Sequence, residues 1–322
     1  MIKPPKLNKG DTIGIFSPSQ SILVEPEHLK GFDNGIKRLH KLGFMTKISK
    51  HAKGKYFYSS GTPEERVSDL HELLADKEVK AILMTVGGDT ANEILPLIDF
   101  DLVKQNPKII MGMSDGTTLL APITDKTGLI TFYGPDLIYT FGLLQKDTEE
   151  FDKQILNCIT GAKTEFLPLN NLADDNDNKI DLAWKTFRNG IAEGQLIGGY
   201  LEIMVELIGS GWLEDLDNKV LYLESMENAA TNHLRFQYLK LMGVYDRING
   251  LILGYFPDVK KGSPYYRAIG DIVLEMTREL DFPILQVNEL GHMVKNYAWP
   301  NGTKVKLDAS NKIITALESP VI

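Results

Sequence analysis

The 322-residue sequence contains a single cysteine, Cys158, so no internal disulfide can form. Disulfides are typical of oxidising compartments, and a chain that cannot form one fits a reducing compartment. No apolar run approaches the roughly 20 residues that a membrane-spanning helix needs. Residues 1–10 also lack the apolar core of a signal peptide. We therefore expect a cytoplasmic protein that does not enter a membrane.

Positive charge is scarce as well. Lysine and arginine number 35 against 43 aspartate and glutamate residues, which leaves a formal net charge of −8 at pH 7. Nucleic acids and anionic membrane surfaces attract clusters of positive charge, and no basic tract interrupts this acidic balance. We therefore expect neither a nucleic-acid partner nor a membrane partner.

Several cofactor and metal motifs are missing. The chain has no G-x-x-x-x-G-K-[ST] loop, and its first predicted strand runs into Ser-Pro-Ser rather than G-x-G-x-x-G. His71-Glu72 begins like the zinc motif H-E-x-x-H, but Ala75 stands where the second histidine belongs. The six histidines show no ligand spacing. The sequence therefore predicts a protein without a metal or a cofactor.

The first half of the chain alternates apolar strand patterns with amphipathic helix patterns. Thr62, Pro63 and Glu65 form a helix start, with a capping box and proline at the first helical position. Parallel strands joined by helices of this length predict a Rossmann-like, doubly wound parallel sheet over an N-terminal α/β domain, residues 1–165. The expected strands are 12–16, 45–48, 79–86, 108–113 and 129–133, and the expected helices are 26–42, 62–75 and a segment ending near 98.

The second half has a different pattern. Residues 166–190 are rich in Asn and Asp and predict a polar linker. Residues 191–322 predict a C-terminal mixed α/β domain with strands 220–223, 250–253 and 283–286 and helices 201–208 and 232–242. Two further strands, 303–307 and 312–316, flank Asp308-Ala309-Ser310-Asn311 and predict a terminal β-hairpin.

One stretch carries a chemical signal. The apolar run 108–113 is followed by Ser114 and then by helix-competent sequence, and Gly112-Met113-Ser114-Asp115-Gly116 fits the nucleophile elbow G-x-S-x-G. A strand-turn-helix of this kind exposes a serine hydroxyl for acyl transfer. The alternative is that Ser114 only caps the helix.

A serine nucleophile needs a base and a carboxylate that orients the base. Among the histidines, His292 follows the predicted strand 283–286 in an irregular loop, which is where catalytic side chains are commonly held. Glu224 stands at the end of the apolar strand 220–223, where an unpaired carboxylate would be costly. We predict Ser114, His292 and Glu224 as the catalytic set, with Glu227 as the rival acid.

The order Ser…Glu…His, together with four further blocks, resembles the LD-carboxypeptidases, a family of serine peptidases. The blocks are Ser60-Gly61-Thr62-Pro63-Glu64-Glu65-Arg66, Val86-Gly87-Gly88-Asp89, Thr131-Phe132-Tyr133-Gly134-Pro135 and residues 246–254. The resemblance covers nearly the whole chain. It implies a two-domain homodimeric hydrolase in which Ser114 attacks a carbonyl and the site lies between the domains.

The Gly-rich turn adds an expectation about the oxyanion. Gly87 and Gly88 let the backbone approach a reacting oxygen closely, so we expect the backbone N–H groups of Gly88 and Asp115 to stabilise it, with Gly87 in the same site.

The chain departs from the family pattern at positions that bear on the substrate. Met113 and Gly116 stand where the family has an aromatic and a branched residue, and Tyr200 stands where it has Asn. Trp184 is the nearest candidate for a Trp that stacks on a nucleobase, and the alternative is a strand residue that packs at the domain interface. The resemblance leaves two small substrates open: a murein tetrapeptide or a peptidyl- or aminoacyl-nucleotide. The alternative functions are a catalytically silent binding protein on the same scaffold and an α/β enzyme that binds a nucleotide or a sugar phosphate at Gly87-Gly88.

Overall fold

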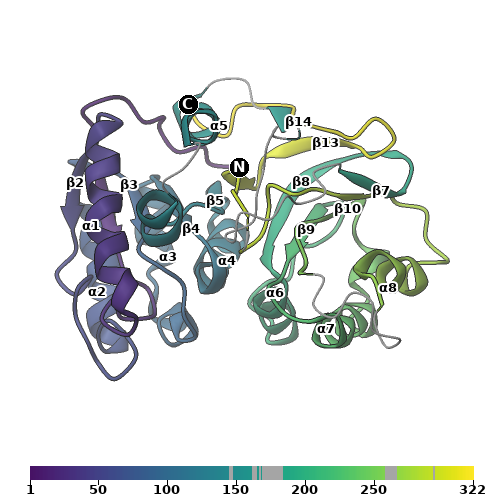
Figure 1. The fold of residues 1–322 in the computed structure, drawn as a ribbon, viewed down its shortest axis with the longest axis horizontal. Coiled ribbons are helices and arrows are strands. Elements are labelled where there is room, and N and C mark those ends of the chain that lie inside the picture. Colours follow the sequence, from purple (N-terminus) through teal and green to yellow (C-terminus); the bar gives the residue numbers. More distant parts are fainter. Residues whose placement is uncertain (145–147, 162–164, 167, 169–183, 258–266, 293) are drawn as a thin grey trace. The chain divides into compact units, whose positions relative to one another are not determined.

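The computed structural model describes residues 1–144, 148–161, 165–166, 168, 184–257, 267–292 and 294–322. The chain divides into two compact units (Figure 1). The first unit comprises Met1–Lys163, Tyr297–Gly302 and Ser319–Ile322, and the second comprises Thr164–Asn296 and Thr303–Glu318. Most of the expected linker, including residues 169–183, lies outside the described residues. In the described ranges no helix has both the length and the apolar character needed to cross a membrane.

The first unit is built on a six-stranded sheet with the order β12-β5-β4-β3-β1-β2. Its elements in chain order are β1 (Thr12–Phe16), α1 (Pro26–Lys41), β2 (Met45–Ile48), α2 (Pro63–Ala75), β3 (Val79–Met84), α3 (Phe100–Gln105), β4 (Ile109–Gly112), α4 (Thr117–Thr127), β5 (Thr131–Tyr133), the π-helical segment η4 (Leu137–Leu143), α5 (Thr148–Thr160) and β12 (Trp299–Asn301). All strand pairs from β2 to β5 are parallel, as the Rossmann-like prediction requires.

The helix α2 shows why the local sequence specifies its element. The Thr62 side chain accepts from the Glu65 backbone N–H, and the Glu65 side chain accepts from the Thr62 backbone N–H. Pro63 occupies the first helical position, where it loses no hydrogen bond. The predicted capping box is therefore confirmed.

The segment after β3 differs from the expectation. Instead of a helix ending near residue 98, two short 3-10 turns are present, η1 (Ala91–Glu93) and η2 (Leu95–Leu97). The expectation was wrong because Pro96 has no backbone N–H and therefore cannot make the hydrogen bond that a continuous α-helix needs at this position.

The edge strand β12 has no counterpart among the strands expected from the sequence. Trp299 pairs with Tyr133 and Asn301 with Thr131, so a segment distant in sequence adds an antiparallel edge to the first sheet. Pro300 is tolerated because edge strands are where a sheet accepts a residue without a backbone donor.

The second unit is built on an eight-stranded sheet with the order β6-β14-β13-β8-β9-β10-β11-β7. Its elements are β6 (Glu165–Phe166), β7 (Lys185–Arg188), β8 (Ile191–Tyr200), α6 (Leu201–Gly209), β9 (Val220–Glu224), α7 (Ala229–Leu241), β10 (Gly250–Leu253), α8 (Ile269–Met276), β11 (Ile284–Gln286), β13 (Lys304–Asp308) and β14 (Ile313–Ala316). Figure 1 shows α6, α7 and α8 in a row, and β13 and β14 form the predicted terminal hairpin.

The mixed character of the second sheet arises from two kinds of connection. Strands β8 to β11 are parallel, whereas β13, β14, β6 and β7 pair antiparallel at the two sides. Within β8 the residue Gly198 is required, because a Cβ at this position would overlap the backbone oxygen of Tyr222 on β9. The α/β fold with a parallel first sheet and a mixed second sheet agrees with the predicted class.

Candidate active site

Ser114 lies at the turn between β4 and α4, at the start of the 3-10 turn η3 (Ser114–Gly116). Its φ is +59°, a left-handed conformation that residues other than glycine rarely adopt and that is found at strained functional turns. Its backbone N–H donates to the Tyr133 hydroxyl at 3.2 Å. The cap of α4 is Gly116, without a side-chain hydrogen bond, so Ser114 is not the helix cap of the alternative interpretation.

The two glycines of the G-x-S-x-G pattern make room for Met84 at the end of β3. A Cβ at Gly112 would overlap the Met84 Sδ, and a Cβ at Gly116 would lie 2.8 Å from the same atom. The methionine therefore occupies the space that a branched residue at position 116 would need.

Gly87 lies directly against the serine turn, and Gly88 follows it and faces the loop after β1. A Cβ at Gly87 would lie 2.7 Å from the Ser114 Cβ, 2.9 Å from its Oγ and 3.1 Å from the Asp115 nitrogen. Gly88 has a φ of +136°, and a Cβ there would lie 2.5 Å from the Ser19 Oγ. The first unit thus brings Ser114, Asp115 and both glycines together.

The Asp115 side chain is buried beneath this turn. Burial raises the pKa of its carboxyl, and hydrogen bonds from Ala91, Ser19 and Thr118 oppose that shift. A buried carboxyl that receives this many donors is held in one orientation.

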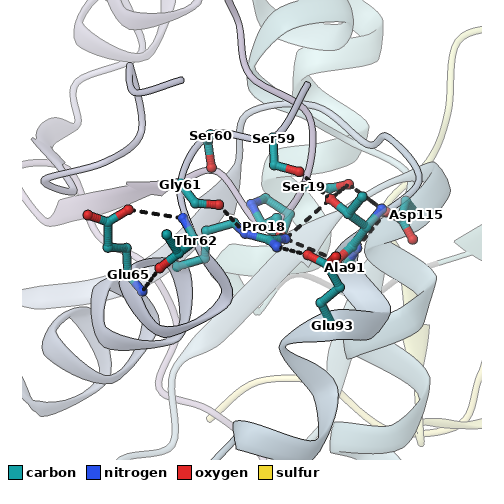
Figure 2. Close-up of polar contacts among 12 residues, drawn as sticks. Pro18, Ser19, Ser59, Ser60, Gly61, Thr62, Glu65, Ala91, Glu93 and Asp115 are labelled. Atoms are coloured by element: carbon teal, nitrogen blue, oxygen red, sulfur yellow. Dashed lines mark hydrogen bonds and ion pairs between the residues drawn. The ribbon is translucent and has the colours of Figure 1, made fainter. Parts of the chain in front are cut away.

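An arginine that the sequence interpretation gave no role lies beside these residues. Arg66 on α2 is 1% exposed, and its guanidinium donates to the backbone oxygens of Gly61 at 3.0 Å, Pro18 at 2.7 Å and Thr90 at 3.0 Å. Figure 2 labels Gly61 and Pro18 among these acceptors. Its remaining bonds reach the Thr90 hydroxyl and the Glu93 carboxylate. A sequence signal existed, because Arg66 shares the helix face of the buried Leu70 and Leu74.

In the second unit the structure brings Glu224 and His292 together. Glu224 ends β9 and is fully buried, and its Oε2 lies 3.0 Å from the His292 Nδ1. The His292 side chain is 15% exposed. A carboxylate beside Nδ1 orients the ring and leaves Nε2 as the nitrogen that can exchange a proton with a substrate.

Tyr200 flanks this pair. It is the register partner of Glu224 across β8 and β9, and its ring centroid lies 4.8 Å from that of His292. Burial raises the pKa of the Tyr200 hydroxyl, as do its hydrogen bond to Glu202 and the charge of the neighbouring glutamates. The phenol therefore stays protonated at neutral pH.

Trp184 does not present its ring to solvent. It is 1% exposed, and its indole N–H donates to the Glu289 Oε2 at 2.7 Å. For the described ranges of the chain, no three His, Cys, Asp or Glu side chains are grouped so that they could hold a metal ion.

Two family models match the chain. The LD-carboxypeptidase N-terminal domain matches residues 13–134, and the LD-carboxypeptidase C-terminal domain matches residues 193–307. These matches fall on the sheets of the two units and define a hydrolase of α/β architecture.

Individual relatives agree with this class. The Escherichia coli microcin C7 self-immunity protein MccF is 36% identical over 96% of this chain and 94% of its own length. The probable murein peptide carboxypeptidase of Bacillus subtilis is 31% identical over 96% and 92%. A solved structure of MccF in complex with aspartyl sulfamoyl adenosine has a TM-score of 0.90 at 31% identity, covering 100% of both chains. The protein described here belongs to the LD-carboxypeptidase family.

Proposed function

We propose that this protein is a serine carboxypeptidase in which Ser114 is the nucleophile, His292 the general base and Glu224 the residue that orients His292. The observation that carries the proposal is the left-handed backbone of Ser114 inside G-x-S-x-G between β4 and α4. This is the backbone conformation expected of a serine that a strand-turn-helix presents as a nucleophile. The hydrogen bond between Glu224 and His292 supplies the partner pair that such a serine needs.

The reaction proceeds through an ester of Ser114. The Ser114 Oγ bonds to the substrate carbonyl carbon while its proton passes to the His292 Nε2. Collapse of the tetrahedral intermediate breaks the C–N bond, and the proton on His292 goes to the leaving amine. Water then attacks the ester and gives a proton to His292, and release of the carboxylic acid returns that proton to Ser114.

The negative oxygen of the intermediate needs donors close to the serine. We assign this role to the backbone N–H groups of Gly88 and Asp115. Gly88 directly follows Gly87, which packs against Ser114, and Asp115 directly follows Ser114 itself. Removal of one such donor typically costs on the order of 10²- to 10³-fold in turnover.

The substrate class is a small amide with a free carboxylate or a nucleotide leaving group. A peptidyl- or aminoacyl-nucleotide is favoured by the similarity to MccF, for which structures with aspartyl sulfamoyl adenosine and glutamyl sulfamoyl guanosine exist. A murein tetrapeptide is the second candidate, because Trp184 is enclosed and bonded to Glu289 rather than open for stacking on a base.

The test compares both substrates on purified protein. We measure two reactions for the native protein and for Ser114→Ala. The first is release of D-alanine from a murein tetrapeptide, and the second is release of aspartate from aspartyl sulfamoyl adenosine. We expect turnover of one substrate and a loss of at least 10³-fold in the variant, whose melting temperature stays unchanged. Ser68→Ala, an exposed serine on α2, serves as the control. Undiminished turnover by a folded Ser114→Ala protein contradicts the mechanism.

The two alternative functions make different predictions in the same experiments. A silent binding protein turns over neither substrate and does not react with a fluorophosphonate. An enzyme that binds nucleotides or sugar phosphates at Gly87-Gly88 is stabilised against heat by those compounds, and Ser114→Ala leaves its activity intact.

We further propose a cytoplasmic C2 homodimer in which each protomer carries its own Ser114, Glu224 and His292. Light scattering at micromolar concentration is expected to give twice the mass of the 36.0 kDa chain. A monomer in that measurement contradicts the assembly and leaves the chemistry untouched.

A further inference from the structure

The carboxylate of Asp115 receives donors from three separate segments. Its Oδ2 accepts from the Ser19 hydroxyl at 2.7 Å and from the Ala91 backbone N–H at 2.9 Å. Its Oδ1 accepts from the Thr118 hydroxyl at 2.9 Å. These donors come from the loop after β1, the turn after β3 and the first turn of α4, so one side chain joins all three segments beside Ser114.

Ser19 connects this carboxylate with the glycine turn. Its Oγ accepts from the Thr90 backbone N–H at 2.9 Å and lies 3.2 Å from the Thr90 hydroxyl. The same oxygen is the nearest atom to a Cβ built on Gly88. The hydroxyl of Ser19 is therefore in contact with Asp115 on one side and with the backbone of Gly88 on the other.

Arg66 holds the segments that carry Ser19 and Thr90. Its donors reach the backbone oxygen of Pro18, which precedes Ser19, and the backbone oxygen of Thr90. The Ser59 hydroxyl adds a contact of 2.9 Å to the Thr90 hydroxyl. The guanidinium is buried, and each of these bonds compensates part of the cost of removing its charge from water.

We infer that Ser19 and the Asp115 side chain are positioning residues that hold the backbone N–H groups of Gly88 and Asp115 in register with Ser114. This inference rests on the proposed function, because it concerns donors to an oxygen that becomes negative only during acyl transfer. A positioning role differs from a purely stabilising one in its kinetics. Misplaced oxyanion donors weaken binding of the transition state and leave binding of the ground state nearly unchanged.

The first test is Ser19→Ala, which removes the hydroxyl and adds no bulk. We expect kcat to fall by roughly 10- to 100-fold, with KM within about twofold of the native value. The matched control is Ser21→Ala, because Ser21 is fully buried in the same loop but donates to the Gly54 backbone oxygen at 2.7 Å. Equal kcat values for the two folded variants overturn the inference.

The second test asks whether the Asp115 side chain supports kcat through its hydrogen bonds or through its negative charge. Asp115→Asn keeps one oxygen for Ser19 and Ala91, and its amide can donate to the Thr118 hydroxyl, whereas Asp115→Ala keeps none of these bonds. We expect Asn to retain kcat within about fivefold and Ala to lose about 100-fold or more. Equal losses in both variants overturn the inference, and melting curves correct each rate for the folded fraction.

Both tests use whichever of the two substrates the native protein turns over, with Ser114→Ala in the same series. If Ser114→Ala is inactive while Ser19→Ala and Asp115→Ala keep the native kcat, only this inference fails. If Ser114→Ala stays active, or if neither substrate is turned over, the proposed function fails and takes this inference with it.

Discussion

A Cβ built on Gly87 lies 2.7 Å from the Cβ of Ser114, so the serine turn tolerates no side chain at position 87. The clash involves an atom attached directly to the Ser114 backbone rather than the end of a flexible chain. The φ of Gly87 is outside the left-handed region, which makes the effect of a substitution purely steric.

Gly87→Ala is expected to lower turnover by on the order of 10²-fold, because Ser114 and the Asp115 nitrogen must move by several tenths of an ångström. The control is Gly209→Ala, whose added Cβ meets only the Met242 Sδ at 3.7 Å, an ordinary contact distance. Native kcat in Gly87→Ala would show that the turn yields without loss and would contradict the geometry proposed for the nucleophile.

Glu224→Gln is expected to reduce kcat by at least about 10²-fold while KM changes little, because the carboxylate stabilises an imidazolium that forms only along the reaction path. An amide nitrogen facing Nδ1 would also select the wrong tautomer of His292. The comparison is Glu227→Gln, because Glu227 is the rival acid and is half-buried. This variant is expected to keep kcat within twofold of the native value. A loss confined to Glu227→Gln would transfer the orienting role to that residue.

Gly116→Ile is expected to lower the free energy of unfolding by about 1–3 kcal/mol, because the new side chain overlaps Met84. Met84→Ala alone opens a cavity and costs about 2–5 kcal/mol. In the double variant the isoleucine fills the space that the methionine leaves. The loss in free energy of unfolding should therefore be smaller than the sum of the losses in the two single variants. Urea unfolding of all four proteins measures this coupling, and simple additivity would show that the two positions do not share one space.

Lys108 supplies a prediction about pH. Its ammonium is buried and donates to the backbone oxygens of Leu73 and Asp76 at the end of α2. Burial, the largest cause, and the charges of nearby lysines lower its pKa to about 8 against the opposing effect of Asp76. In the unfolded chain the group titrates near its ordinary pKa of about 10.4.

Between about pH 8 and pH 10 the unfolded chain therefore binds more protons at this position than the folded chain, and stability rises with pH. We expect the free energy of unfolding of the native protein, measured relative to that of Lys108→Met, to increase by roughly 2 kcal/mol across this window. Below pH 8 the difference should be flat. A difference that stays constant from pH 7 to pH 10 would contradict the prediction.

Local patterns were sufficient for much of the fold. The strand at 12–16 and the helix start at Thr62 depend on residues adjacent in the chain, which contact each other in any compact state. The hairpin at the end of the chain depends on a short turn, for the same reason. Local propensity failed at Pro96, where one missing donor broke an otherwise apolar helical pattern into 3-10 turns.

The site divides in the same way. G-x-S-x-G is a local motif and could be named from the sequence, as could the candidates Glu224 and His292. That the last two lie 3.0 Å apart across 68 residues depends on the sheet that carries Glu224 and the loop that carries His292, which no local pattern specifies. Likewise the sequence offered Trp184 as a stacking residue, and its hydrogen bond to the distant Glu289 shows an enclosed side chain.

The sequence by itself determined the family, the five parallel strands of the first sheet and the chemical types of the candidate residues, because these follow from short-range sterics, hydrogen bonding and residue identity. Only the tertiary structure decided which polar groups surround and support the candidate residues. Arg66, Ser19 and Thr90 come from three segments, and their contacts with one another and with Asp115 exist only after the strands of the first sheet have paired. Burial strengthens each of these hydrogen bonds and makes the loss of a partner costly, because the packed interior has a low dielectric constant. The local sequence does not determine this effect.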